Sequence, residues 1–246
     1  MMCLRYGKTI IPVLFENEFC LVLNKPSGLS VQGGEGVGFS LDSILSEKIS
    51  PRPHLVHRLD RDTSGIILVA KTKTAAAGFS ALFSGGEAVL KTGKRRSIVK
   101  QYLSICSGLP GKKKGVIRLD LEEQGKNRIV VNKKSETFFR LLSSGNFGEM
   151  NYSLLELELG TGRMHQIRRH LAQTGNPVLG DDKYGDFPLN KKLKKECGLK
   201  NLLLHASRLI IPPSPGLVPE GLDLDAPLPE HFSSFVKLLT FPPTLP

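Results

Sequence analysis

Residues 54–67 read HLVHRLDRDTSGII, and this stretch decides the fold prediction because a cluster of charges runs straight into a hydrophobic segment. Two histidines, two arginines and two aspartates precede Thr63 and Ser64. The hydrophobic residues that follow, from Gly65 to Lys71, are typical of a strand buried on both faces. The stretch is therefore either a charged turn in solvent or a segment that presents a reactive carboxylate beside a buried strand.

Hydrophobic periodicity and helix start and stop signals predict the other elements. Strands are expected at 19–23, 100–105, 155–159 and 202–211. Helices are expected at 41–50, where Ser40 is the cap, and at 74–84 and 164–174. A last helix, from about Pro229 to Leu239, is expected to pack on the body of the protein through residues that include Phe232 and Phe235. The third helix rests on Met164, Ile167 and Leu171, which are spaced by three and four residues. Strands outnumber helices and several are joined by short turns, so we expect an α+β fold with a mixed, largely antiparallel central sheet flanked by helices and loops.

The charge balance points to a polyanionic partner. The 246 residues carry 34 Lys and Arg against 23 Asp and Glu, a formal charge of +11 and a pI near 9.6. Such an excess attracts nucleic acid or an anionic membrane surface, although it is also compatible with a merely soluble basic surface. No hydrophobic run approaches the roughly 18 residues of a spanning helix, and the N-terminal segment is a poor signal peptide. We therefore expect a cytoplasmic protein that binds a polyanion.

Cysteine and glycine patterns add no site. The four cysteines are scattered without a Cys-x-x-Cys pair, which indicates reduced thiols and predicts neither a disulfide framework nor a zinc site. The glycine-rich segment 33–38 is followed by no phosphate-binding Lys-Ser/Thr, and we interpret it as a loop.

Asp60 can be a nucleophile, a metal ligand, an acid or base, or half of a salt bridge. Asp60 and Asp62 form an Asp-x-Asp pair like that of haloacid dehalogenase phosphatases, and Gly180-Asp181-Asp182 resembles the later segment of those enzymes. The phosphatase interpretation is weak for two reasons. Arg58 and Arg61 compete with Mg²⁺ for the carboxylates, and the residues around the pair do not follow that pattern.

Several segments together carry a family resemblance. The stretch 57–65, HRLDRDTSG, resembles the signature of the RluA-type RNA pseudouridine synthases at nearly every fixed position. Further segments are similar to motifs of the same family and occur in family order; they are 24–29 (NKPSGL), 100–102 (KQY), 160–170 (GTGRMHQIRRH), 177–185 (PVLGDDKYG), 203–206 (LLHA) and 225–229 (DAPLP). The matches extend from about residue 18 to 235. The resemblance implies the pseudouridine synthase catalytic fold as a single domain.

The resemblance implies roles for three catalytic residues. Asp60 is the nucleophile that attacks the target uridine, Tyr102 stacks on the displaced uracil, and Arg168 pairs with Asp60 across the site. The physics agrees, because a carboxylate nucleophile can divide this isomerisation into easier covalent steps without a cofactor. A guanidinium opposes the rise in carboxyl pKa that burial under RNA would cause. Without the resemblance, Tyr102 would more simply be a core or edge-strand tyrosine and Arg168 a surface arginine.

The resemblance and the charge pattern together indicate the RNA-binding residues. Arg58 resembles the side chain that fills the gap left by the flipped base. Leu204 resembles the hydrophobic wall against the uracil, with Leu203 nearly as good a match. The complete prediction is His57, Arg58, Arg61, Lys94, Arg95, Arg96, Lys100, Arg163, His165 and Leu204. We expect no catalysis by the histidines, and we expect Asp62 to stabilise the loop.

The predicted partner is ribosomal or transfer RNA, with no cofactor, metal or membrane. Many relatives carry an RNA-binding domain before the catalytic one, and the 23 residues before Asn24 are too few for such a domain. Recognition is then expected from basic segments of the catalytic domain, namely 91–100, 112–114 and the lysines at 191, 192, 194 and 195. The resemblance favours a monomer. The alternative from another class is an RNA-binding module of the same fold that does no chemistry.

Overall fold

The computed structural model describes residues 3–34, 39–85, 88–89, 95–124 and 130–240. The chain divides into two compact units, each described by itself. Unit 1 contains residues 1–100 and 205–228, and unit 2 contains residues 101–204 and 229–246. The α+β class and the mixed, largely antiparallel arrangement are confirmed, since a single strand pair in the described part of unit 1 is parallel.

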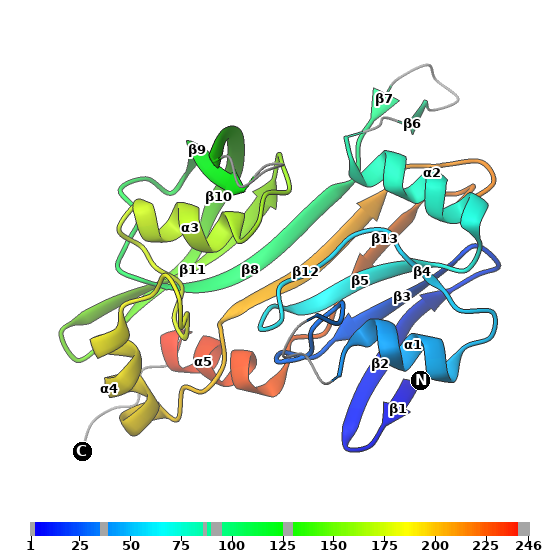
Figure 1. The fold of residues 1–246 in the computed structure, drawn as a ribbon. Helices are drawn as coiled ribbons and strands as arrows, with labels where there is room; N and C mark the ends of the chain where they lie inside the picture. Colours follow the sequence, from blue (N-terminus) through cyan, green and yellow to red (C-terminus); the bar gives the residue numbers. More distant parts are fainter. Residues whose placement is uncertain (1–2, 35–38, 86–87, 90–94, 125–129, 241–246) are drawn as a thin grey trace. The chain divides into compact units, whose positions relative to one another are not determined.

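Unit 1 is built on a sheet around one fully buried strand (Figure 1). Strand β5 (Ser64–Ala70) pairs antiparallel with β3 (Cys20–Lys25), which continues the sheet through β2 (Thr9–Glu16) to β1 (Cys3–Tyr6). On its other side β5 pairs in parallel with β12 (Leu204–Ile211) near its start and antiparallel with β4 (His54–Leu55) at its end. Strand β13 (Leu222–Asp225) completes the unit as the antiparallel partner of β12. The predicted buried strand is therefore confirmed, and it is the centre of the unit.

Helices α1 (Leu41–Lys48) and α2 (Lys73–Phe83) each begin after a capping side chain, the first at the predicted Ser40 and the second at Thr72. The Ser40 hydroxyl accepts a hydrogen bond from the amide of Ser43, and Thr72 does the same for Ala75. Such caps satisfy amides that the first helical turn leaves without partners. The face of α2 that carries Ala75 and Phe79 packs on side chains of β3 and β5. A short two-stranded pair, β6 (Ala88–Val89) with β7 (Arg95–Arg96), follows α2.

Unit 2 is an antiparallel sheet with helices beside it (Figure 1). Its strand order is β8 (Val99–Ser107), β11 (Met150–Leu159), β10 (Val130–Phe147) and β9 (Lys114–Gln124). Helix α3 (Gln166–Gln173) packs on β9 and β10, and α5 (Glu230–Thr240) packs on β10 and β11. Phe232 and Phe235 of α5 are buried, as the sequence predicted. Helix α4 (Phe187–Cys197) lies between α3 and β12 in the chain.

One predicted helix starts too early. The sequence placed Met164 on the buried face of a helix from 164 to 174, but Met164 is 54% exposed and α3 begins at Gln166. The cause is His165, whose backbone has φ of 52° and is left-handed, so it cannot continue a helix. Ile167 and Leu171 are buried as expected.

Candidate active site

Asp60 lies in the loop between β4 and β5, with buried residues on both sides of it. Leu59 and Thr63 are 6% and 2% exposed, whereas the Asp60 side chain is half-buried and Arg58 and Arg61 are exposed. The loop is thus anchored before and after Asp60 by side chains that point inward. This arrangement presents the carboxylate at position 60 on a segment with little freedom to move.

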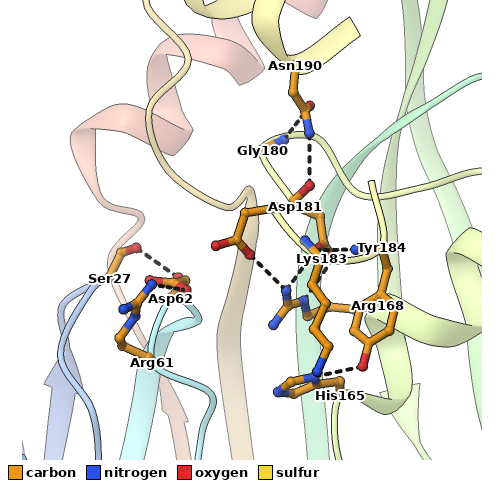
Figure 2. Close-up of polar contacts among 11 residues, drawn as sticks. Ser27, Arg61, Asp62, His165, Arg168, Gly180, Asp181, Lys183, Tyr184 and Asn190 are labelled. Atoms are coloured by element: carbon orange, nitrogen blue, oxygen red, sulfur yellow. Dashed lines mark hydrogen bonds and ion pairs between the residues drawn. The ribbon is translucent and has the colours of Figure 1, made fainter. Parts of the chain in front are cut away.

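A second loop, residues 25–29, is bonded to the backbone beside Asp60. The Lys25 ammonium donates three hydrogen bonds to carbonyl oxygens, those of Pro26 at 3.0 Å, Leu29 at 2.8 Å and Arg61 at 2.9 Å. The Ser27 hydroxyl donates to the carbonyl oxygen of Asp62 (Figure 2), and the Gly28 amide donates to that of Arg61. The two residues after Asp60 are therefore fixed by this second loop through backbone atoms.

The Lys25 side chain is fully buried. Burial lowers its pKa to about 7, while the charges of Asp62 and Asp60 oppose the decrease. All three N–H groups of its ammonium are used within the protein, which is the condition for burying such a group at tolerable cost. Lys25 thus serves as an internal crosslink of the loop that carries Asp60.

Asp62 pairs with its neighbour Arg61, whose Nε and Nη2 donate to its two carboxylate oxygens at 3.1 and 3.2 Å (Figure 2). The pair is solvent-exposed on the arginine side and contributes little to stability. The expectation that Asp62 stabilises the loop stays a prediction.

His57 makes the contacts of a packing residue in unit 1. Its Nε2 accepts a hydrogen bond from the amide of Leu68 at 2.9 Å, and its ring stacks on Phe83 with centroids 4.1 Å apart. Burial, together with the charge of Lys100, lowers the pKa of His57 to about 3. The ring is therefore neutral at physiological pH. Its predicted RNA contact stays a prediction.

Gly65 permits a close approach of two strands directly after the signature. Its φ is +112°, and a Cβ atom there would lie 2.2 Å from the carbonyl oxygen of Ala206 on β12. Beside it, the buried Ser64 hydroxyl lies 2.9 Å from Nδ1 of His205, whose Nε2 faces the carbonyl oxygen of Ala226 at 3.3 Å. Since a carbonyl only accepts, Nε2 carries the proton and Ser64 donates to Nδ1. Glycine is required here by packing as well as by backbone conformation.

In unit 2, Arg168 is buried and paired with Asp181 (Figure 2). Its Nε lies 2.8 Å from one Asp181 oxygen and its Nη2 lies 2.7 Å from the other, and the two residues are 4% and 1% exposed. Its guanidinium carbon also lies 5.3 Å from the centre of the Tyr184 ring. This bidentate geometry orients the guanidinium plane. The predicted pairing of Arg168 with Asp60 stays a prediction.

Asp181 is in turn held by the chain around it. Its Oδ1 accepts hydrogen bonds from the amides of Lys183 and Tyr184, and its backbone carbonyl accepts one from Asn190 on α4. Burial acts to raise the pKa of Asp181, but the hydrogen bonds from Arg168 and from the two amides outweigh it and lower the pKa. The carboxylate is therefore ionised and fixed. The sequence did not predict that Asp181 pairs with Arg168, because no local pattern ties two residues that are 13 positions apart.

The segment before α3 is fixed by Gln166 and His165. The buried Gln166 amide group donates to the carbonyl of Glu136 and to Thr137, and its oxygen accepts from Thr161 and the Arg163 amide. His165 Nδ1 lies 3.1 Å from the Tyr184 hydroxyl (Figure 2). These contacts set the position from which Arg168 projects.

Tyr102 lies on β8, opposite Leu157 of β11, and is 8% exposed. Leu203 and Leu204 are both buried, so burial does not distinguish the two candidates for the uracil wall. Arg163 is half-buried, and its buried Nε has no hydrogen-bond partner among the residues that the structure describes. Burial lowers the pKa of Lys100. Arg95 and Arg96 form β7, and Lys94 lies outside the described residues.

In the described part of the chain, no group of three His, Cys, Asp or Glu side chains is arranged to hold a metal ion. Among the same residues, no helix has the length and apolar character needed to cross a membrane.

Comparison with known proteins identifies the class that this fold and these motifs define, an RNA pseudouridine synthase. The family model described as RNA pseudouridylate synthase matches residues 19–173. The chain is 35% identical over 237 residues to ribosomal large subunit pseudouridine synthase C of Haemophilus ducreyi, covering 92% of this chain and 68% of that protein. It is 32% identical over 230 residues to the protein of the same name from Rickettsia typhi, covering 90% and 69%.

The chain belongs to the RluA-type RNA pseudouridylate synthase family and is an enzyme of that class. It is also 37% identical over 195 residues to RNA pseudouridine synthase 4, mitochondrial, of Arabidopsis thaliana; this match covers 70% of the chain but spans only 40% of that protein. The solved structure of human RNA pseudouridylate synthase domain containing 4 superposes with a TM-score of 0.72 at 27% identity, covering 93% of this chain and 92% of that one. These relatives do not favour the phosphatase or the non-catalytic module.

Proposed function

We propose that this enzyme isomerises uridine to pseudouridine in large-subunit ribosomal RNA, with Asp60 as the nucleophile. The observation that carries the choice of RNA is the name shared by its bacterial relatives, ribosomal large subunit pseudouridine synthase C, at 31–35% identity. The +11 charge supports an RNA substrate, since phosphate attraction is independent of sequence. We further propose that it acts in the cytoplasm as a monomer, through a single catalytic domain.

The reaction breaks the N1–C1′ bond of uridine, turns the uracil and joins its C5 to C1′, with loss of the C5 proton to solvent. Atoms balance because a proton returns to N1. The Asp60 carboxylate forms the transient covalent bond to the nucleotide and leaves again. This role requires an ionised carboxylate on a fixed segment, and the loop anchored by Leu59, Thr63 and Lys25 supplies the fixed segment.

Tyr102 and Arg168 are proposed to serve the displaced base and the nucleophile. An aromatic face that stacks on an extruded base is worth about 1–3 kcal/mol, and this offsets part of the few kcal/mol that extrusion costs. A guanidinium favours the ionised form of a nearby carboxylate. Arg168 suits that role because Asp181 already orients it. Exposed Arg58 and Arg61, with the other eight residues of the complete RNA-binding prediction, are proposed to contact RNA.

The test is the Asp60→Asn variant with Asp62→Asn as its matched control. An unmodified transcript of bacterial large-subunit ribosomal RNA is incubated with each protein, and pseudouridine is mapped by carbodiimide labelling and primer extension. Asp60→Asn is expected to form none while keeping its RNA affinity, and Asp62→Asn is expected to keep most of the turnover. Full turnover by Asp60→Asn would end the assignment of the nucleophile. If the wild-type protein modifies transfer RNA but not this transcript, the proposed substrate is wrong.

A further inference from the structure

Helix α4 carries a concentration of positive charge that the chemistry above does not use. Between residues 186 and 200 five lysines stand against two acidic residues, and four of the lysines lie within the five positions from 191 to 195. All four are exposed, and none forms an ion pair within the described residues. Five residues of helix extend over only about 6 Å of axis, so this is a dense cationic patch.

The lysines of α4 face outward because the leucines of the same helix face inward. Leu189 and Leu193 are 8% and 1% exposed and lie on one side of α4. At 3.6 residues per turn, Lys191, Lys194 and Lys195 fall on the opposite side, and Lys192 flanks them. Phe187, at the start of the helix, is 57% exposed. An exposed aromatic ring beside lysines is a combination that suits nucleic acid, since a ring can stack on a base while the lysines contact phosphates.

Helix α4 has defined ends and a fixed attachment. The Asp186 side chain accepts a hydrogen bond from the Leu189 amide, and Gly198 ends the helix in the left-handed conformation. Asn190 bonds the helix to the segment that holds Arg168, because its amide accepts from Gly180 N and donates to the carbonyl of Asp181, both at 2.9 Å (Figure 2). The helix that carries the cationic patch is therefore hydrogen-bonded to the backbone of Asp181, whose side chain pairs with Arg168.

We propose that the exposed face of α4 binds the phosphate backbone of the substrate RNA. The inference rests on the proposed function for the kind of RNA. A membrane surface is a poorer partner, because an amphipathic helix that binds lipid inserts its apolar face, and the apolar face of α4 is buried in the protein. Because Asn190 links α4 to Asp181, RNA held on this face is held relative to the Arg168 segment.

The test replaces Lys191, Lys194 and Lys195 with Gln in the Asp60→Asn protein and measures its affinity for the large-subunit ribosomal RNA transcript between 50 and 200 mM salt. Gln preserves helix propensity, and circular dichroism checks that the fold is intact. Each lost phosphate contact makes the slope of log K against log salt shallower by about 0.7–0.9. Three contacts predict a slope shallower by about 2–3, so that the fourfold rise in salt costs the variant about 20–40 times less affinity than it costs the parent.

Two control variants also replace three lysines each. Replacing the same three lysines with Arg keeps the charge and is expected to keep the parental slope. Replacing Lys8, Lys48 and Lys73 of unit 1 with Gln removes as many exposed charges elsewhere and is expected to change the slope by less than 1. In the active protein, the α4 triple Gln variant should raise KM and leave kcat at saturating RNA unchanged.

An α4 triple Gln variant with the parental slope, or with a change no larger than that of the unit 1 control, overturns the inference. So does loss of binding to phosphatidylserine vesicles without any change in the RNA slope. The proposed function fails by a different result, namely absence of pseudouridine in RNA treated with the wild-type protein.

Discussion

Replacing Asp181 with Asn should destabilise the protein by about 3–5 kcal/mol, because it leaves the Arg168 guanidinium buried without its counter-charge. The magnitude follows from the structure. The two side chains are 4% and 1% exposed, and they share two charge-assisted hydrogen bonds of 2.7 and 2.8 Å. An Asn amide group at Oδ2 would place a donor against the Arg168 Nε donor. The loss is about a fifth or more of the roughly 5–15 kcal/mol typical of a folded protein.

The assay is urea unfolding followed by fluorescence of tyrosine and by circular dichroism. With a slope of about 3 kcal/mol per molar, the midpoint should fall by about 1–1.7 M urea. Asp182→Asn is the matched control. Asp182 lies 3.4 Å from the same guanidinium but its side chain is 71% exposed, so its replacement should cost less than about 0.5 kcal/mol.

A double variant isolates the pair. Arg168→Met with Asp181→Asn removes both charges and keeps an Oδ1 acceptor for the amides of Lys183 and Tyr184, so it should be more stable than Asp181→Asn alone. The reasoning is refuted if Asp181→Asn and Asp182→Asn shift the midpoint equally, or if the double variant loses the full sum of the single losses. None of these unfolding measurements depends on the catalytic activity of the protein.

Three further predictions concern unit 1. The pKa of His57 is lowered to about 3, so below about pH 6.5 the unfolded state takes up a proton before the folded state does, and stability decreases. In urea titrations the wild-type protein should therefore lose about 2 kcal/mol more than His57→Gln between about pH 7.5 and pH 5. Equal losses would contradict this. Gly65→Ala should lower the free energy of unfolding by more than about 3 kcal/mol, because the added Cβ would lie 2.2 Å from the carbonyl oxygen of Ala206. Gly28→Ala, where φ is +84° and the space is open, should lower it by only about 1–2 kcal/mol. Similar shifts in melting temperature would show that packing is not the cause. Lys25→Met should lower kcat by about 10–100-fold at unchanged RNA affinity because the Asp60 loop loses its crosslink, with Lys8→Met as control, and wild-type turnover would rule this out.

Much of the fold was predictable because its signals are local. The cap at Ser40, the hydrophobic run of β5 and the spacing of Phe232 and Phe235 each identify an element from a few neighbouring residues. The start of α3 was wrong, because periodicity counts Met164 as helical while the left-handed backbone of His165 excludes it.

The candidate site was predictable to a smaller extent. The identity of Asp60, Tyr102 and Arg168 rests on family motifs, and their roles stay predictions. What could not be predicted is which partners hold these residues. Lys25 is a residue type that is almost never fully buried. Two of its three hydrogen-bond acceptors, the carbonyls of Pro26 and Leu29, are close in sequence, but the third, that of Arg61, is supplied only by the approach of a distant segment. Such partners are set by tertiary contacts, for which the order of residues along the chain contains no short-range signal.

The interlaced course of the chain affects how the protein is made. Strand β5 in unit 1 pairs with β12, and 133 residues separate Ala70 from Leu204. A ribosome adding about 5–20 residues per second needs roughly 7 to 27 seconds to synthesise that interval. During this time the nascent chain exposes part of one edge of the hydrophobic strand β5, which gives chaperones a reason to bind it. For the same reason, a fragment cut before His205 should be insoluble, and a split form of the enzyme would have to be assembled from pieces that overlap both units.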